Sequence, residues 1–367
     1  AYRFPVVVGQ AGTAEVQFRS ALNGNQDAFK VPLQVRPLDV TEQVVETGRT
    51  NTQVTIPIQV SPQASNEVGG LEVNLASSLM PQLTAPVKQV LDETHLPFLE
   101  PAASQLRIAA TLQTLGQVYG QTFAGFAPAR QAQQSMERLR PLQKPDGGFA
   151  AYPGQEKSDP FLTPYAAQAL AQADRVFGQQ ISQGMQPALT SYLNQLLANP
   201  GQYDFCKEQA CQNQVRLEAL IALAELGDRR GDFLSEIYAG RTQLDPVQQI
   251  KLARYLLQFP AWQLEAKTLA AELQEVVNQT GRSATVNLPQ NWYWLNSDTA
   301  IQAQALQLFI AQSGNSDLVN RLAQGLLAQR REGTWSTTYD NAAALTALVD
   351  YSKLQPTPPN FQATAQL

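Results

Sequence analysis

The strongest constraint in this sequence is a change of hydrophobic period near residue 80. Before that point, apolar and polar side chains alternate in short runs. Four of these runs are residues 14–18, 29–35, 54–60 and 71–75. Clusters of Gly, Asn, Pro and Ser separate them, as is typical of strands joined by turns. Pro32 and Pro57 lie inside runs and favour edge strands or strand ends. We therefore predict a β-sandwich or barrel region over residues 1–80.

From about Ala85 the apolar residues recur three and four positions apart, in segments dominated by Ala, Leu and Gln. This spacing puts them on one face of an α-helix. Gly and Pro signals such as Phe259-Pro260 and Ser313-Gly314 end the segments. At the mean helix length, about 270 residues hold roughly a dozen helices. The fold class predicted is a multidomain α and β chain.

The helical half contains a weak repeat. In each unit an aromatic residue in a loop precedes a polar residue and a helix of small residues. The units begin near Asp146, Asn291 and Gly333. Repeated helical hairpins stack on their neighbours and form a solenoid or a ring. The aromatic residue would fill the gap between hairpins.

The polar residues of these repeats are interpreted as helix caps, since a side-chain oxygen can accept hydrogen bonds from the first free amides. On this basis Asp159, Asp298 and Asp340 are predicted to be caps and not catalytic carboxylates. The tryptophans admit a second interpretation, in which Trp292, Trp294 and Trp335 are stacking surfaces of a degenerate polysaccharide-binding toroid. Buried tryptophans would favour the first interpretation and exposed ones the second.

Composition and charge exclude several function classes. Charged residues make up only 16%, the net charge is -5 and the hydrophobic content is 44%. A general nucleic-acid binder needs a basic excess, which is missing here. No apolar run approaches the roughly 18 residues of a membrane span. The first residues, Ala1 to Pro5, do not form a signal peptide. We therefore expect a soluble fragment or processed product of a longer protein, called the parent below.

The two cysteines, Cys206 and Cys211, have four residues between them. A structural zinc site needs four ligands, and this pair has only one distant histidine to join it. No metal site and no cofactor are predicted. Three alternatives remain for the pair: a local disulfide in an oxidising compartment, two unlinked thiols, or a redox pair.

Two motifs carry a family resemblance over essentially the whole chain. The first is the loop Gly147-Gly-Phe-Ala-Ala-Tyr-Pro-Gly154, followed by a helix start at Leu162-Thr-Pro-Tyr-Ala166. The second is the segment Gly333-Thr-Trp335, followed by Asn341-Ala342. Together they resemble the thioester-domain region of the alpha-2-macroglobulins, and the bacterial branch in particular.

The resemblance implies a domain organisation. Residues 81–355 would form an α/α toroid, the thioester-type domain. Residues 1–80 would be β-rich segments of macroglobulin-like and CUB-like domains, and residues 356–367 would start the return to the split CUB-like domain. The resemblance also implies a partner class, because family members trap proteases.

The family's chemistry is a strained internal thioester within a Cys-x-Glu-Gln motif on the first helix of this domain. In the matching stretch here, Phe98 falls on the Cys, Glu100 on the Glu and Pro101 on the Gln, with Ser104 and Leu106 following. Without a thiol and a side-chain amide at these two positions, no thioester forms there. The thioester motif is therefore predicted to be degenerate.

The letters Cys-x-Glu-Gln do occur elsewhere, from Cys206 to Gln209. This match follows the Gly-Gly-Phe loop, whereas the family motif precedes it. A thioester between Cys206 and Gln209 is the alternative to a Cys206–Cys211 disulfide.

The remaining candidates for catalysis are weak. His95 precedes a helix in a polar loop, and Ser104 has no predicted base beside it. Toroidal enzymes such as terpene cyclases and protein prenyltransferases need an Asp-x-Asp-Asp run or a zinc site, and neither is found. We therefore predict that the chain is not an enzyme.

The function expected from the resemblance is that of a fragment of a bacterial alpha-2-macroglobulin-like protease inhibitor that lacks a working thioester and acts by non-covalent contact. Its partners would be proteases, met through the full-length parent, or periplasmic envelope proteins, and not nucleic acids. The parent would be a periplasmic lipoprotein anchored to the inner membrane. The alternatives are a periplasmic scaffold without inhibitory activity and the polysaccharide-binding toroid.

Overall fold

The structure is a computed structural model. It describes residues 12–35, 80–92, 96–119, 126–178, 181–288 and 295–354, with short stretches between residues 3 and 73. The chain divides into two compact units. One comprises residues 1–44 and 55–73, and the other residues 45–54 and 74–367.

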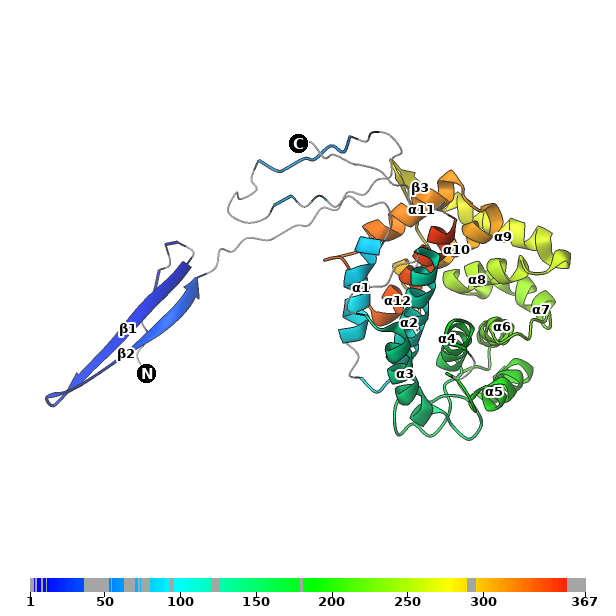
Figure 1. Cartoon of the computed structure of the whole chain (residues 1–367), viewed down its shortest axis with the longest axis horizontal. Coiled ribbons are helices and arrows are strands. Elements are labelled where there is room, and N and C mark those ends of the chain that lie inside the picture. Colours follow the sequence, from blue (N-terminus) through cyan, green and yellow to red (C-terminus); the bar gives the residue numbers. More distant parts are fainter. Residues whose placement is uncertain are drawn as a thin grey trace. The chain divides into compact units, whose positions relative to one another are not determined.

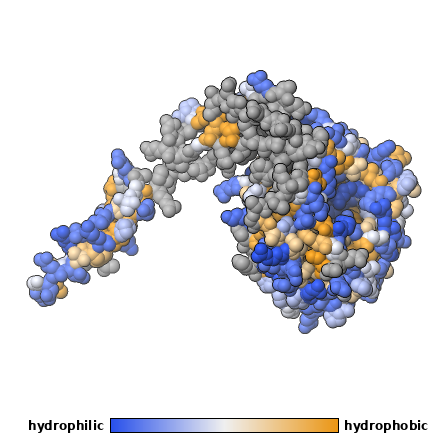
Figure 2. Space-filling model, in the orientation of Figure 1, coloured by the Kyte–Doolittle hydropathy of each residue, from blue (hydrophilic) through white to orange (hydrophobic). Residues whose placement is uncertain are grey.

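The first unit contains an antiparallel hairpin of β1 (Gly12–Leu22) and β2 (Asn25–Val35). Asn23 and Gly24 form its turn with φ of 50° and 84°, the left-handed conformation that two-residue hairpins favour. Phe18 and Phe29 face each other with ring centroids 5.0 Å apart. Both rings are partly exposed, and Figure 2 shows apolar residues along the hairpin surface.

Only some of the strands predicted for the N-terminal β region are found in the described residues, and they form a hairpin and no sandwich. The runs at 14–18 and 29–35 are strands, as predicted. Residues 55–60, also predicted as a strand, are described but form none, and Ile58 and Val60 are exposed. A strand needs a paired neighbour, and none lies beside this run among the described residues.

The second unit is mostly helical (Figure 1), as the change of period predicts. Its helices are α1 (Met80–Asp92), α2 (Leu99–Tyr119), α3 (Pro128–Leu139), α4 (Leu162–Phe177), α5 (Gln186–Ala198), α6 (Gln209–Glu225), α7 (Leu234–Ala239), α8 (Pro246–Leu256), α9 (Gln263–Glu275), α10 (Asp298–Ser313), α11 (Asp317–Ala328) and α12 (Thr338–Lys353). Within the described ranges, four single 3-10 turns lie at residues 140–142, 200–202, 241–243 and 260–262.

The even-numbered helices contact one another in series from α2 through α4, α6, α8 and α10 to α12, and α12 contacts α2. Each odd-numbered helix contacts an even-numbered neighbour in sequence, as α3 does with α2 and α9 with α8. The repeat seen in the sequence therefore corresponds to a repeated pairing of helices.

The burial patterns explain which helix takes which place. On α3 the buried residues are Ala132, Ser135, Met136 and Leu139, which form one stripe of a helix that faces water elsewhere. On α4 eleven of 16 residues are buried, and on α12 twelve of 16. A helix buried nearly all round needs neighbours on every side, and the even-numbered helices have them.

A short hairpin of β3 (Val277–Thr280) and β4 (Ser283–Val286), which the sequence did not predict, packs on α11. The close approach depends on Gly325 of α11, because a Cβ there would lie 2.0 Å from the carbonyl oxygen of Ala284. Small residues let neighbouring backbones approach closely.

A buried ion pair joins two of the even-numbered helices. The Glu218 carboxylate of α6 accepts a hydrogen bond from Lys251 Nζ of α8 at 2.5 Å and from Gln248 Nε2 at 2.6 Å. Both members of the ion pair are buried. Burial raises the pKa of Glu218, but the attraction of Lys251 and the hydrogen bonds outweigh it and leave the pKa below its ordinary value.

Lys251→Met is expected to cost about 3–5 kcal/mol of stability, because it leaves Glu218 buried without its counter-ion. Replacing both residues, as Glu218→Leu with Lys251→Met, should recover most of that loss. Urea unfolding measures both effects. The control is Lys353→Met at the exposed Lys353–Asp350 pair, which should cost less than about 1 kcal/mol. Equal costs for the two lysines would contradict the assigned role of the buried pair.

Candidate functional site

The residues that match the family's thioester motif lie at the start of α2. The amide of Ala102 donates to the carbonyl of Phe98 at 3.3 Å, so Phe98 takes the cap position and Pro101 the third helical position. Side chains at these two positions of a helix lie next to each other. Proline is tolerated in this first turn, where the amide would lack a partner within the helix.

The start of α2 is held by the Gly-Gly-Phe loop. The Leu99 amide donates to the carbonyl of Ala151 at 2.9 Å. Gly147 has a φ of 92°, and a Cβ there would lie 2.0 Å from the carbonyl oxygen of Ala188 on α5. Phe149 is fully buried. The two glycines and the phenylalanine therefore serve to dock this loop between α2 and α5.

Phe98 and Pro101 differ in exposure. The Phe98 side chain is 43% exposed, and Pro101 is half-buried. Two further apolar side chains are also exposed: Leu96, just before α2, at 52%, and Tyr152, in the Gly-Gly-Phe loop, at 51%. Neither Phe98 nor Pro101 carries a thiol or an amide, so this pair has no group that could form an acyl–sulfur bond.

Glu100, between them, is the centre of a polar cluster. Its carboxylate accepts hydrogen bonds from Ser104 Oγ at 2.6 Å and from Thr338 Oγ1 at 2.8 and 2.9 Å. Ser104 Oγ also lies 2.7 Å from the hydroxyl of Tyr165. The cluster joins the starts of α2, α4 and α12.

Burial raises the pKa of Glu100, while the hydrogen bonds from Ser104 and Thr338 lower it and the charge of Asp340 raises it further. The net pKa is above the ordinary value. Asp340 behaves alike: burial raises its pKa against the hydrogen bonds from Ser297 and Thr337. Two neighbouring carboxylates thus resist ionisation at one end of the even-numbered helices.

This arrangement favours a structural role over catalysis. Ser104 is fully buried and its hydroxyl is occupied by Glu100 and Tyr165. Tyr165 stands edge-on to Tyr339 with ring centroids 5.2 Å apart, and its own pKa is raised by burial. A nucleophile without access to solvent has no route to a substrate.

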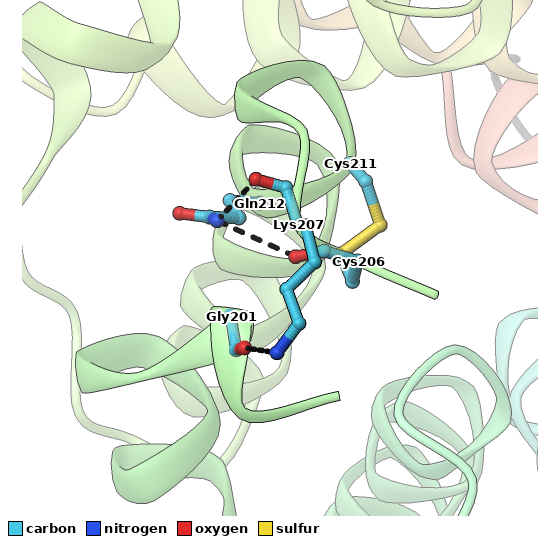
Figure 3. The surroundings of a disulfide bond; sticks show 5 residues. All are labelled: Gly201, Cys206, Lys207, Cys211 and Gln212. Atoms are coloured by element: carbon cyan, nitrogen blue, oxygen red, sulfur yellow. Dashed lines mark hydrogen bonds between the residues drawn. A yellow bond between two sulfur atoms is a disulfide. The ribbon is translucent and has the colours of Figure 1, made fainter. Parts of the chain in front are cut away.

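The second place with candidate chemistry is the cysteine pair (Figure 3). Cys206 and Cys211 form a disulfide with Cα atoms 5.3 Å apart. The Gln212 amide donates to the carbonyls of Cys206 at 3.4 Å and Lys207 at 3.0 Å. Gln209 Nε2 donates to Asn213 Oδ1 at 2.9 Å and also to the Glu236 carboxylate. The sulfur of Cys206 and the amide of Gln209 therefore have different partners.

Among the described residues, no group of three or more His, Cys, Asp and Glu side chains could hold a metal ion. No helix in the described ranges has the length and apolar character needed to cross a membrane.

No family model matches the sequence. A curated protein of Nostoc sp. (strain PCC 7120), named alpha-2-macroglobulin homolog, is 54% identical over 367 residues, which is 100% of this chain and 19% of that protein. The chain belongs to the alpha-2-macroglobulin family. It spans about a fifth of the length of this relative.

Solved alpha-2-macroglobulins share the fold. The Salmonella protein reacted with methylamine aligns with a TM-score of 0.58 and 19% identity over 93% of this chain and 22% of its own. The Escherichia coli protein activated by porcine elastase aligns with a TM-score of 0.53 and 19% identity over 72% of this chain and 24% of its own. At this identity the likeness concerns the fold alone.

Two of the three cap predictions need correction. Asp159 does accept hydrogen bonds, from the amides of Phe161 and Leu162 at 2.9 and 2.8 Å. Asp298 and Asp340, however, are already helical. The caps are Ser297, which accepts from Ala300, and Thr337, which accepts from the Asp340 amide, each at 3.0 Å. A hydroxyl one to three residues earlier competes successfully for the free amides.

Trp335 is buried at 2% exposure and donates from Nε1 to the carbonyl of Leu326 at 3.0 Å. It fills a gap between α11 and α12 and offers no stacking surface, so the polysaccharide interpretation is wrong for this residue. Trp292 and Trp294, like His95, lie outside the described residues.

Sequence reasoning missed Tyr165, Thr338 and Tyr339 as members of the cluster around Glu100. The partners of Tyr165 and Thr338 are 61 and 238 residues away along the chain, and Tyr339 joins the cluster through its ring contact with Tyr165. The one available signal was their position: each lies at the start of a helix in a family motif or repeat unit.

Glu100→Gln should flatten the pH dependence of stability. Because the pKa of Glu100 is raised in the folded state, its contribution is fully present below about pH 4.5 and is lost as the pH rises through the folded value. In urea unfolding between pH 4 and 7, the variant is expected to gain on the wild type with rising pH. The exposed Glu137→Gln on α3 serves as the control. A loss that grows with rising pH would mean that the charged carboxylate is needed as an acceptor, and an equal loss at every pH would mean that folding does not raise the pKa of Glu100.

Proposed function

We propose that this chain is the thioester-type domain, with adjoining β segments, of an alpha-2-macroglobulin-type protease-trapping protein that has lost the thioester. Residues 81–355 form an α/α toroid, residues 1–80 belong to macroglobulin-like and CUB-like domains, and residues 356–367 begin the return strand. The domain acts by non-covalent contact and is not an enzyme.

The contact series of the even-numbered helices supports the toroid. Because α12 contacts both α10 and α2, the series from α2 to α12 returns to its start. Repeated helical hairpins that close in this way leave no terminal repeat exposed, unlike an open solenoid, which needs capping repeats.

The observation that carries the functional proposal is the pair of side chains at the start of α2. The cap and third positions of this helix, which lie next to each other, hold Phe98 and Pro101. These are the positions that the family resemblance assigns to the thioester cysteine and glutamine. Covalent capture needs an acyl–sulfur bond, and these side chains supply neither half of it.

The exposed apolar side chains around this helix start support a contact role. Phe98, Leu96 and Tyr152 are each about half exposed, although large apolar side chains are usually buried. The curated relative is about five times longer than this chain, so further domains are available to cover them. In the parent, we propose that other domains pack against this surface, at the place where they would shield the thioester in a family member that has one.

Proteases are the proposed partners, reached through the full-length parent. A solved relative is described as activated by porcine elastase, which supports this partner class. The acidic net charge of -5 argues against nucleic acid. A disulfide between Cys206 and Cys211 fits an oxidising compartment, and the periplasm, with a lipid anchor on the parent, is the proposed location.

The absence of a thioester is tested by intact mass before and after methylamine. We expect a mass two hydrogens below that of the reduced chain, no free thiol and no methylamine adduct. The matched variant is Cys211→Ser under reducing conditions, which frees the Cys206 sulfur but keeps the Cys206–Gln209 stretch intact. A methylamine adduct on Gln209 in either protein would refute the proposal.

Non-covalent action is tested with the full-length parent and a panel of proteases. A trapped protease should comigrate with the parent on a native gel and separate from it completely in SDS. Phe98→Ala in the parent should weaken this association, whereas Val118→Ala, a similarly exposed residue near the other end of α2, should not.

The same assay separates the two function classes. If no protease of the panel associates with the parent, a periplasmic scaffold without inhibitory activity becomes the better account. An association that survives SDS would mean covalent capture, and the central claim would be wrong.

A further inference from the structure

A cavity of about 190 Å³ lies at the ends of α4, α6 and α8 that are opposite to the Glu100 cluster. It is partly open to solvent. Its polar lining comprises Arg175, Glu225, Arg229, Lys251, Arg254, Tyr255 and Gln258. Four cationic side chains and one carboxylate therefore surround the cavity, in a chain whose net charge is -5.

Two of the four cations are neutralised by protein carboxylates. Arg175 Nη2 lies 2.6 Å from Glu225 Oε2, and its Nη1 donates to the Glu225 carbonyl at 2.9 Å. Lys251 is paired with the buried Glu218. Glu225, the one carboxylate of the lining, is thus paired with Arg175. It makes no direct ion pair with Arg229 or Arg254.

Arg254 and Arg229 have no such partner among the described residues. Arg254 Nη1 donates to the side-chain oxygens of Gln304, at 3.1 Å, and Gln307, and both of these groups are neutral. Arg229 is exposed and makes no hydrogen bond or ion pair with any residue that the structure describes. Burial lowers the pKa of Arg254, partly offset by the more distant charges of Glu225 and Asp350. A partly buried charge without a carboxylate partner is costly.

The available donors suit an oxyanion. A guanidinium presents parallel N–H groups that match carboxylate and phosphate oxygens, and it keeps its charge at all accessible pH values. The Tyr255 hydroxyl is already committed to the carbonyl of Arg230 at 2.7 Å, so it shapes the wall without taking part in binding. Two uncompensated charges favour a ligand with two or more negative charges.

We propose that this cavity binds a small, multiply charged oxyanion of the phosphate class, held by Arg229 and Arg254 with Lys251 and Arg175 beside them. The site lies at the opposite ends of the helices from the start of α2 and does not depend on the proposed protease trapping. Free phosphate, diphosphate and phosphate monoesters share this chemistry.

The test is a calorimetric titration of the 367-residue chain with inorganic phosphate, pyrophosphate and glycerol phosphate at constant ionic strength, with chloride as the reference. We expect saturable binding, tightest for the ligand that the cavity fits best. Binding of pyrophosphate alone would indicate a diphosphate site. Binding of glycerol phosphate more tightly than phosphate would indicate a monoester site.

Arg229→Gln is the decisive variant, since the exposed side chain can be changed without disturbing the fold. It should weaken binding of the preferred anion at least about tenfold, as expected for the loss of one charge-assisted contact. Arg130→Gln, an exposed arginine on α3, is the matched control and should bind like the wild type.

Two results would overturn the proposal. One is the absence of saturable binding of all three anions up to about 10 mM, weaker than millimolar affinity. The other is equal binding by Arg229→Gln and Arg130→Gln. If equal binding were accompanied by a lower melting temperature for Arg229→Gln but not for Arg130→Gln, the role of these cations would be to stabilise the negative ends of the helix dipoles.

Discussion

The helical unit depends on hydrogen bonds made by buried polar side chains. These side chains lie between helices that expose almost no surface to solvent. The buried Gln302 of α10 illustrates this requirement. Its Nε2 donates to the carbonyls of Ala284 and Leu322 at 2.8 and 2.9 Å, and its Oε1 accepts from the Val286 amide at 3.0 Å. One side chain thus joins α10, α11 and β4. A buried amide with fewer partners would cost more than it contributes.

The same requirement explains residues that the family motifs contain. Asn341 is fully buried, accepts from the Trp335 amide at 3.1 Å and donates to the carbonyls of Trp335 and Thr337 at 2.9 and 2.8 Å. It fixes the loop that carries the buried tryptophan to the start of α12. Gly147 and Phe149 do the same for α2 and α5. These motif residues hold loops in place between helices, and they would be needed with or without a thioester.

This division indicates how far sequence reasoning could reach. Local patterns sufficed for the helical period, the hairpin runs at 14–18 and 29–35, and the burial of Trp335, because each depends on neighbours in the chain. Two caps were predicted one to three residues too late in the chain, because Ser297 and Thr337 precede the aspartates and compete for the same amides. The cluster around Glu100 and the cavity near Arg254 could not be foreseen, since each joins side chains from three helices whose packing the sequence does not state.

The Glu100 cluster and the cavity, which lie at opposite helix ends, carry ionisable groups of opposite sign. At the starts of α2 and α12, Glu100 and Asp340 sit where the helix dipoles favour negative charge, yet burial raises the pKa of both. In the lining of the cavity at the ends of α4, α6 and α8, arginines outnumber carboxylates, again in the sense that the dipoles favour. The cavity thus holds cations that the helix dipoles attract, whereas at the other end burial opposes ionisation of the carboxylates. Groups of both kinds gain most from a partner that completes their contacts.

The contacts at the start of α2 indicate what loss of a thioester would mean for this fold. The start of α2 is held by the Leu99–Ala151 hydrogen bond and by the cluster of Glu100, Ser104 and Thr338. None of these contacts uses the side chain of Phe98 or Pro101. The positions assigned to the acyl–sulfur bond are thus free to change without loosening the helix start. On the proposed function, covalent chemistry could disappear from this site while the surface that other domains cover kept its shape.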